Sequence, residues 1–150
     1  MKLRWGALVI VLVLSALMPR VLTAQGTQNP GRERKAGALK QNYPNPFNPE
    51  TRIPFRIGDE SCEDPSRQHK VSLRIYNILS QLVAVPVLQG GAGGVAGGVR
   101  LDNVMLTCGD YVAYWDGKYM GTRNEVASGV YLYELRIDGQ SLVKRMLVTK

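Results

Sequence analysis

The sequence is poor in the residues that carry most active-site chemistry. It has one histidine, His69, and two cysteines, Cys62 and Cys108. No second His or Cys stands at metal-binding spacing from His69, and no Cys-x-x-Cys pair is present. No Ser-His-Asp set forms around His69 either. We therefore expect no enzyme, no bound metal and no cofactor, and we expect His69 to be a surface loop residue.

Two segments are similar to ligand-binding loops in composition alone. Asp59, Glu60, Glu63 and Asp64 cluster near Cys62, but their spacing matches no cation-binding loop. Residues 90–98 contain six glycines in nine positions, without the Gly-Lys-Ser/Thr ending and following helix of a phosphate loop. We interpret the first as a solvated acidic turn and the second as a flexible connection.

The sequence also lacks an apolar run long enough for a membrane span. Its longest is the twelve residues 7–18, against about 20 for a spanning helix. Basic residues precede this run, Pro19 and Arg20 end it, and small residues follow at Ala24 and Gly26. This layout is typical of a secretory signal peptide, residues 1–24, cleaved after Ala24 or after Gly26. An uncleaved anchor is the alternative.

The excess of basic residues lies in the expected signal peptide and in the linker that follows it. The net charge is +7, but residues 1–24 carry three basic residues and residues 25–40 a further net +3. From Gln41 onward, 12 basic residues face 11 acidic ones. We expect a linker over 25–40, a single domain over 41–150, and no nucleic-acid partner. Contact with a membrane is expected only through the N-terminal signal. We expect the exported protein to reside in the periplasm, on the outer-membrane surface or outside the cell.

The cysteine pair permits a disulfide in an exported protein. Cys62 and Cys108 both fall in predicted loops beside strands, and closing a loop of this length would stabilise the fold by about 4 kcal/mol. Two free thiols are the alternative.

Residues 41–49 contain three prolines, which exclude helix and central strand because each lacks a backbone donor. They predict an extended strap that turns at Asn48 and Pro49. Tyr43 and Phe47 are the side chains expected to attach this strap to a core.

Alternating apolar residues after the strap predict several strands and no helix. The expected strands span 51–57, 71–76, 82–87, 99–105, 111–115, 129–137 and 141–148, with polar loop over 58–70 and hairpin turn signal at Asp138-Gly139. Pro54 suggests that the first of these lies at a sheet edge, and Pro86 interrupts the third. Tyrosines and Trp115 are expected in the core. The pattern predicts an all-β sandwich of about seven strands.

Four segments in this order resemble the C-terminal sorting domain (type A) of type IX secretion cargo, which overlaps the immunoglobulin-like domain of the flagellar hook-capping protein. They are the strap Tyr43-Pro44-Asn45-Pro46-Phe47-Asn48-Pro49, the turn Trp115-Asp116-Gly117, the segment Ala127-Ser128-Gly129-Val130-Tyr131, and a terminal strand over 144–148. Residues 71–77 are also similar to that family's second strand.

This resemblance implies an immunoglobulin-like sandwich that directs an exported protein across the outer membrane to the cell surface. It implies outer-membrane secretion machinery as partner, met through the last strand around Lys144, Arg145 and Lys150. Family members usually carry a longer cargo before this domain, whereas here about 16 residues separate the expected cleavage site from the strap. They also usually have an acidic loop after the Trp-Asp-Gly turn, whereas the loop here, Lys118 to Glu125, is not acidic. The alternatives are a stand-alone envelope module that binds other envelope proteins, and a remnant of a larger secreted protein.

Overall fold

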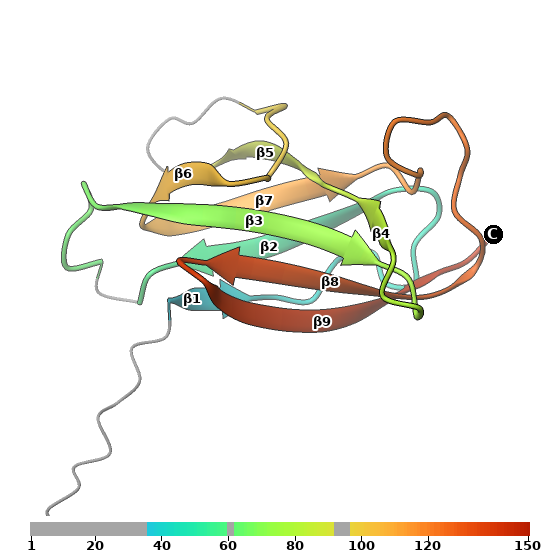
Figure 1. Ribbon diagram of the computed structural model, residues 1–150, viewed down its shortest axis with the longest axis horizontal. Helices are drawn as coiled ribbons and strands as arrows, with labels where there is room; N and C mark the ends of the chain where they lie inside the picture. The colour runs from blue at the N-terminus through green and yellow to red at the C-terminus, as the bar shows by residue number, and fades with distance from the viewer. Residues whose placement is uncertain (1–35, 60–61, 92–96) are drawn as a thin grey trace, which may run out of the picture. The chain divides into compact units, whose positions relative to one another are not determined.

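Two antiparallel β-sheets pack face to face to form a sandwich (Figure 1). The structure is a computed structural model that describes residues 36–59, 62–91 and 97–150. Within these ranges there are nine strands, against about seven expected: β1 (Gly37–Leu39), β2 (Thr51–Ile57), β3 (Gln68–Tyr76), β4 (Leu82–Ala84), β5 (Val87–Gly91), β6 (Val104–Thr107), β7 (Gly109–Trp115), β8 (Gly129–Ile137) and β9 (Gln140–Val148).

One sheet has the strand order β1-β2-β7-β5, and the other has the order β4-β3-β8-β9, with β6 also paired to β3. The predicted all-β sandwich is confirmed. The strands alternate as the period-2 pattern requires, with Ile53, Phe55 and Ile57 of β2 facing Leu73 and other inner residues of the second sheet across one core. Trp115 and the tyrosines at 111, 131 and 133 are buried in this core, as expected, but the other four tyrosines are exposed or half-buried.

The predicted edge position of β2 is wrong, because β2 lies between β1 and β7. The backbone N–H and C=O groups of successive residues in β2 point alternately to its two neighbours, and this explains how Pro54 is accommodated. The N–H and C=O of Arg52 bond to Tyr43, and the carbonyl of Pro54 accepts a hydrogen bond from Lys40 N at 3.0 Å. The missing donor of Pro54 therefore faces the place where the chain leaves β1, not the ladder with β7.

The linker expected to end at residue 40 is shorter, since β1 pairs with β2 from Gly37. Gly37 permits this pairing because a Cβ there would collide with the carbonyl oxygen of Arg56. Leu39 is buried in the core. The expected signal peptide and residues 25–35 of the linker lie outside the described residues.

The strand expected over 82–87 is two strands in different sheets. β4 pairs with β3, and β5 pairs with β7, with Val85 and Pro86 between them. Because proline lacks a ladder donor, Pro86 marks the place where the chain crosses from one sheet to the other.

Three other boundaries differ from expectation. β3 begins at Gln68, inside the predicted loop, because β6 pairs with its first residues. The strand expected over 99–105 is displaced to β6, while Arg100 forms only a bridge to Val87. Gly90 and Gly91 belong to β5, and residues 92–96 of the glycine-rich segment lie outside the described residues.

The hairpin at Asp138-Gly139 is confirmed. β8 and β9 pair in register from Gly129↔Val148 to Ile137↔Gln140. Asp138 and Gly139 both have positive φ angles, +48° and +89°, as a two-residue type I′ turn requires. The last strand is thereby fixed beside β8, at the edge of its sheet.

The described residues from Ala36 to Lys150 belong to one compact unit, and its core extends from Leu39 to Val148. In the described part of the chain, no helix has the length and apolar character needed to span a membrane.

Candidate functional site at the C-terminal end of the sandwich

The strap, residues 41–49, lies along the end of β9. Phe47 N donates to the carbonyl of Leu147 at 3.0 Å, and Thr149 N donates to the carbonyl of Phe47 at 3.0 Å. Asn45 Oδ1 accepts a hydrogen bond from Leu147 N at 2.9 Å. The strap also bridges to β2 through Tyr43 and Arg52, so it closes the sandwich between β2 of one sheet and β9 of the other.

An aromatic cluster connects this strap to the core. The rings of Phe47 and Trp115 meet edge to face with centroids 5.4 Å apart, and Trp115 meets Tyr131 in the same way at 5.9 Å. Both polar ring atoms are satisfied locally: Trp115 Nε1 donates to the Lys118 carbonyl and Tyr131 Oη to the Ala127 carbonyl, each at 3.0 Å.

The Trp115-Asp116-Gly117 turn packs closely under the strap. Gly117 has a φ of +71°, and a Cβ there would overlap the carbonyl oxygen of Pro49. The segment that begins at Ala127 is held at the same place, because Val126 N donates to the Gly117 carbonyl at 2.8 Å. Ser128 Oγ in turn accepts a hydrogen bond from Lys150 N at 3.1 Å.

The four sequence segments therefore meet at one end of the sandwich, around the C-terminal strand (Figure 1). The role expected for Tyr43 is wrong, since its side chain is half exposed while that of Phe47 is buried. Asn42 takes that role. Its amide donates to Thr51 Oγ1 at 3.0 Å and to the Pro44 carbonyl at 3.1 Å, and its N–H donates to Tyr133 Oη at 3.1 Å.

Asn42 was missed because asparagine is common in turns and carries no apolar signal. The only sequence signal is its position directly before the strap aromatics. A buried polar side chain needs a hydrogen-bond partner for each polar atom. Asn42 has them, since Gln41 Nε2 also donates to Asn42 Oδ1.

The three basic residues expected to contact a secretion partner lie on β9 and at the C-terminus. Lys144 is paired in register with Tyr133 and Arg145 with Leu132, so the two side chains leave opposite faces of the strand. Both are exposed. Lys150 Nζ lies 3.3 Å from Glu125 Oε2. Lys144 and Arg145 therefore share the outer edge of β9, whereas Lys150 lies beyond the end of the strand, next to Ser128 and Glu125.

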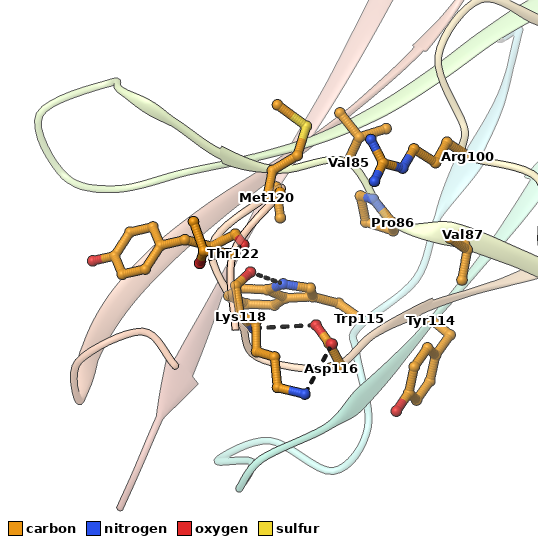
Figure 2. A pocket seen from close by; sticks show the side chains of 13 residues that line it. Val85, Pro86, Val87, Arg100, Tyr114, Trp115, Asp116, Lys118, Met120 and Thr122 are labelled. Atoms are coloured by element: carbon orange, nitrogen blue, oxygen red, sulfur yellow. Dashed lines mark hydrogen bonds and ion pairs between the residues drawn. The ribbon is translucent and has the colours of Figure 1, made fainter. Parts of the chain in front are cut away.

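A groove of about 290 Å³ opens beside the cluster, where Pro86 leaves the sheet (Figure 2). Trp115, Pro86 and Met120 supply apolar wall, with Arg100 and Lys118 on its rim. Lys118 Nζ lies 3.5 Å from Asp116 Oδ2. Tyr114 is turned away from Trp115, and its hydrogen bond to Glu50 at 2.6 Å, together with burial, raises its pKa to about 12.

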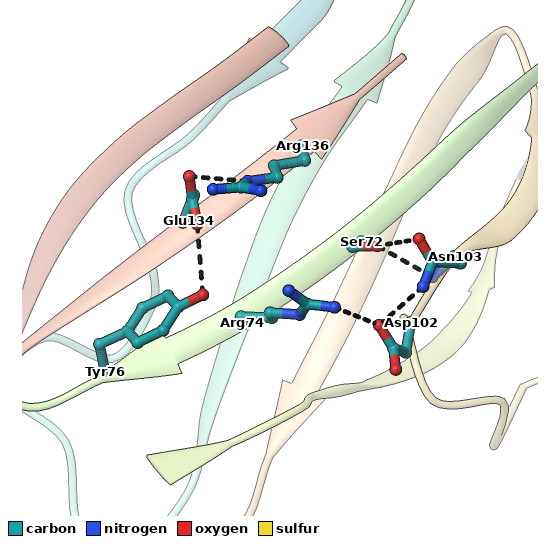
Figure 3. Close-up of polar contacts among 7 residues, drawn as sticks. All are labelled: Ser72, Arg74, Tyr76, Asp102, Asn103, Glu134 and Arg136. Atoms are coloured by element: carbon teal, nitrogen blue, oxygen red, sulfur yellow. Dashed lines mark hydrogen bonds and ion pairs between the residues drawn. The ribbon is translucent and has the colours of Figure 1, made fainter. Parts of the chain in front are cut away.

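The outer face of the second sheet carries an extended polar network (Figure 3). Arg74 pairs with Asp102 at 2.8 Å, and Arg136 Nε with Glu134 Oε1 at 3.0 Å. Burial acts to raise the pKa of Glu134, but hydrogen bonds from Ser141 and Arg136 outweigh it and lower that pKa. Because these charges are paired with one another, we interpret the network as part of the surface structure and not as a functional site.

The opposite end of the sandwich contains the disulfide between Cys62 and Cys108. Cys62 lies in the β2–β3 loop and Cys108 between β6 and β7. Gly58, with a φ of +79°, makes room for the bond, since a Cβ there would come within 2.7 Å of Cys108 Sγ. A structural disulfide is typical of proteins outside the reducing cytoplasm.

The acidic residues that the structure describes near this disulfide do not assemble into a metal site. Among the residues that the structure describes, no three His, Cys, Asp or Glu side chains gather as metal ligands. Glu60 lies outside the described residues. His69 is in β3 and mostly buried, not in a surface loop, because its Nδ1–H donates to Asp138 Oδ2 at 2.7 Å across the β8–β9 turn.

Comparison of the chain with protein-family models, curated proteins and solved structures finds no significant match. The fold and the contacts above are therefore the basis for the functional proposal.

Proposed function

We propose that this chain is a non-catalytic, exported β-sandwich module that directs secretion across the outer membrane and to the cell surface, as the C-terminal sorting domains that it resembles do. The observation that supports this role is the meeting of all four motif segments around the last strand. A machinery that reads the C-terminus needs that strand held in one conformation at an accessible edge.

The contacts of β9 meet that requirement. β9 pairs with β8 along its whole length on one side. On the other side, the strap bonds only to its end, through Leu147, Thr149 and the carbonyl of Arg145. Of the residues the structure describes, none pairs with the outward backbone groups of Val143, so this part of the edge is open to an added strand.

A reporter fusion tests the proposal. An exported reporter joined to residues 34–150, in a host with a type IX secretion system, is expected to reach the cell surface or the medium. Arg145→Glu should reduce its surface fraction, whereas Arg67→Glu, an exposed charge reversal at the disulfide end, should leave it unchanged.

The proposal fails if the folded, disulfide-bonded fusion stays in the periplasm. If Arg145→Glu and Arg67→Glu reduce the surface fraction equally, Arg145 is not part of the proposed contact. The parent fusion alone then decides the sorting role.

A further inference from the structure

A long stretch of the chain carries no charge. From Ile75 to Val99 there is no Asp, Glu, Lys, Arg or His, although 21% of all residues are charged. Burial in the core accounts for Val83, Ala84 and Leu88, but residues 77–82 are exposed or partly exposed and also carry no charge. The described part of this stretch forms β4, β5 and the turn that joins β3 to β4.

The β3–β4 turn presents two apolar side chains to solvent. Ile78 is 75% exposed and Leu79 is 72% exposed, the highest values among the large apolar residues of the described chain. Neither contributes to the core. Exposing two adjacent large aliphatic side chains is unfavourable in water, so their position requires an explanation other than folding.

The turn holds these side chains in a defined position. Asn77 Oδ1 accepts hydrogen bonds from Leu79 N at 3.0 Å and Gln81 N at 2.9 Å, and the Asn77 carbonyl accepts one from Ser80 N at 3.0 Å. Three donors of the turn are therefore satisfied within it. This lowers the cost of moving the turn into a less polar medium.

Further exposed apolar side chains lie next to the turn. Leu82 begins β4, and Met120 N donates to the Val83 carbonyl at 2.9 Å, which brings the loop over 118–122 alongside β4. Leu82, Tyr119 and Met120 are each at least 40% exposed. We define the β4 tip surface as Ile78, Leu79, Leu82, Tyr119 and Met120.

The charges around the β4 tip surface favour an anionic partner. Arg100 lines the groove together with Met120, and its guanidinium is directed toward Val85 (Figure 2). In the described part of the chain, neither Arg100 nor Arg123, two residues before Glu125, has an ion-pair partner. The neighbouring carboxylates are already paired, Asp116 with Lys118 and Glu125 with Lys150.

We propose that the β4 tip surface docks the domain onto an anionic lipid bilayer, with Ile78 and Leu79 inserted at the interface and Arg100 facing lipid phosphates. Apolar side chains on a charge-free tip, followed by unpaired arginines, match the order of acyl and headgroup layers at such an interface. This contact is additional to the N-terminal membrane contact expected from the sequence, and it does not depend on the sorting role.

Vesicle flotation tests the proposal with the processed chain, purified after export. The chain is expected to float with vesicles of equal parts phosphatidylglycerol and phosphatidylcholine. Ile78→Ser with Leu79→Ser should weaken this binding by at least about tenfold. The matched control, Met105→Ser with Val143→Ser, removes two exposed apolar side chains outside the surface and should bind like the parent chain.

Arg100 has a separate readout. Arg100→Gln should weaken binding to the anionic vesicles by about fivefold and leave binding to pure phosphatidylcholine vesicles unchanged. Arg67→Gln, at the disulfide end, is the matched control and should change neither. Thermal unfolding of all variants should resemble that of the parent chain, since every substituted residue is exposed.

Several results would overturn the proposal. One is absence of flotation with anionic vesicles, and another is equal flotation of the Ile78→Ser/Leu79→Ser variant and its control. Concentration-dependent dimerisation that this variant abolishes, without vesicle binding, would assign the surface to a second copy of the chain. Capture of a single envelope protein by the parent chain alone, again without vesicle binding, would assign it to a protein partner.

Discussion

Individual polar residues position the strap as much as its aromatic rings do. Asn42 is buried and connects the strap to Thr51 of β2, while its backbone is connected to Tyr133 of β8. A buried amide of this kind stabilises only while every partner is in place, because an unpaired buried polar group costs about 1–3 kcal/mol.

Substituting the three asparagines of this region one at a time tests that account. Asn42→Ala should lower the free energy of unfolding by about 2 kcal/mol, because buried partners lose their hydrogen bonds. Asn45→Ala, which loses one exposed bond to Leu147 N, should cost about 1 kcal/mol. Asn48→Ala should change stability by less than about 0.5 kcal/mol. Chemical denaturation gives the three values, and an equal loss at all three positions would contradict the assignment.

A second residue-scale prediction concerns pH. Burial acts to raise the pKa of Asp138, but hydrogen bonds from the His69 ring and Lys70 N outweigh it, so this pKa lies below its ordinary value of 3.8. A carboxyl whose pKa is lower in the folded state stabilises the fold above that ordinary value, and the contribution is lost as pH falls through the folded-state pKa.

Asp138→Asn should therefore destabilise the protein by about 1 kcal/mol at neutral pH. Asparagine tolerates the positive φ at this position, so the turn itself is preserved. The difference from the parent chain should shrink as the pH is lowered below 3.8, which denaturation curves at several pH values can follow. A difference that stays constant with pH would show that Asp138 acts through the turn and not through its charge.

At the scale of elements, the strap is a connection that supports the tertiary structure. It joins β1 to β2 in sequence, yet it also bonds to β9 and packs against Trp115 of β7. Its removal from the core would expose the aromatic cluster and free the end of the last strand.

The two strap aromatics should differ widely in their contribution. Phe47→Ala should destabilise the domain by about 3–5 kcal/mol, because it leaves a cavity against Trp115. Tyr43→Ala should cost less than about 1 kcal/mol, because half of that side chain is exposed. Thermal or chemical unfolding of the two variants provides the comparison. Similar losses of stability in the two variants would mean that Tyr43 attaches the strap to the core in spite of its exposure.

At the scale of the whole molecule, the two ends of the sandwich are held in different ways. The strap and the C-terminal strand close one end by hydrogen bonds and aromatic contacts. The disulfide closes the other, where it connects two places at which the chain passes from one sheet to the other.

The disulfide should therefore contribute to global stability. Cys62→Ser with Cys108→Ser should lower the free energy of unfolding by about 2–4 kcal/mol, since the unfolded chain gains conformational freedom. Reductant should lower the melting temperature of the parent chain and have no effect on the double variant. A parent chain insensitive to reductant after demonstrated reduction would contradict this contribution.

The sequence by itself determined the all-β class and several element bounds. The alternation of β2 and β8 and the Asp138-Gly139 turn are set by side-chain period and by local φ preference, which need no distant partner. The same is true of the strap, whose prolines exclude helix and ladder wherever it lies.

Only the tertiary structure decided which of these local features act together. Pro54 lies in an internal strand because the side that lacks a backbone donor is turned away from β7. Pro86 lies between two strands that belong to different sheets. Both placements depend on neighbours remote in sequence. Burial of Asn42, exposure of Tyr43 and the pairing of His69 with Asp138 likewise follow from how strap, turn and strands meet. Local preference acts through neighbouring residues, whereas burial and pairing depend on the packing of the two sheets.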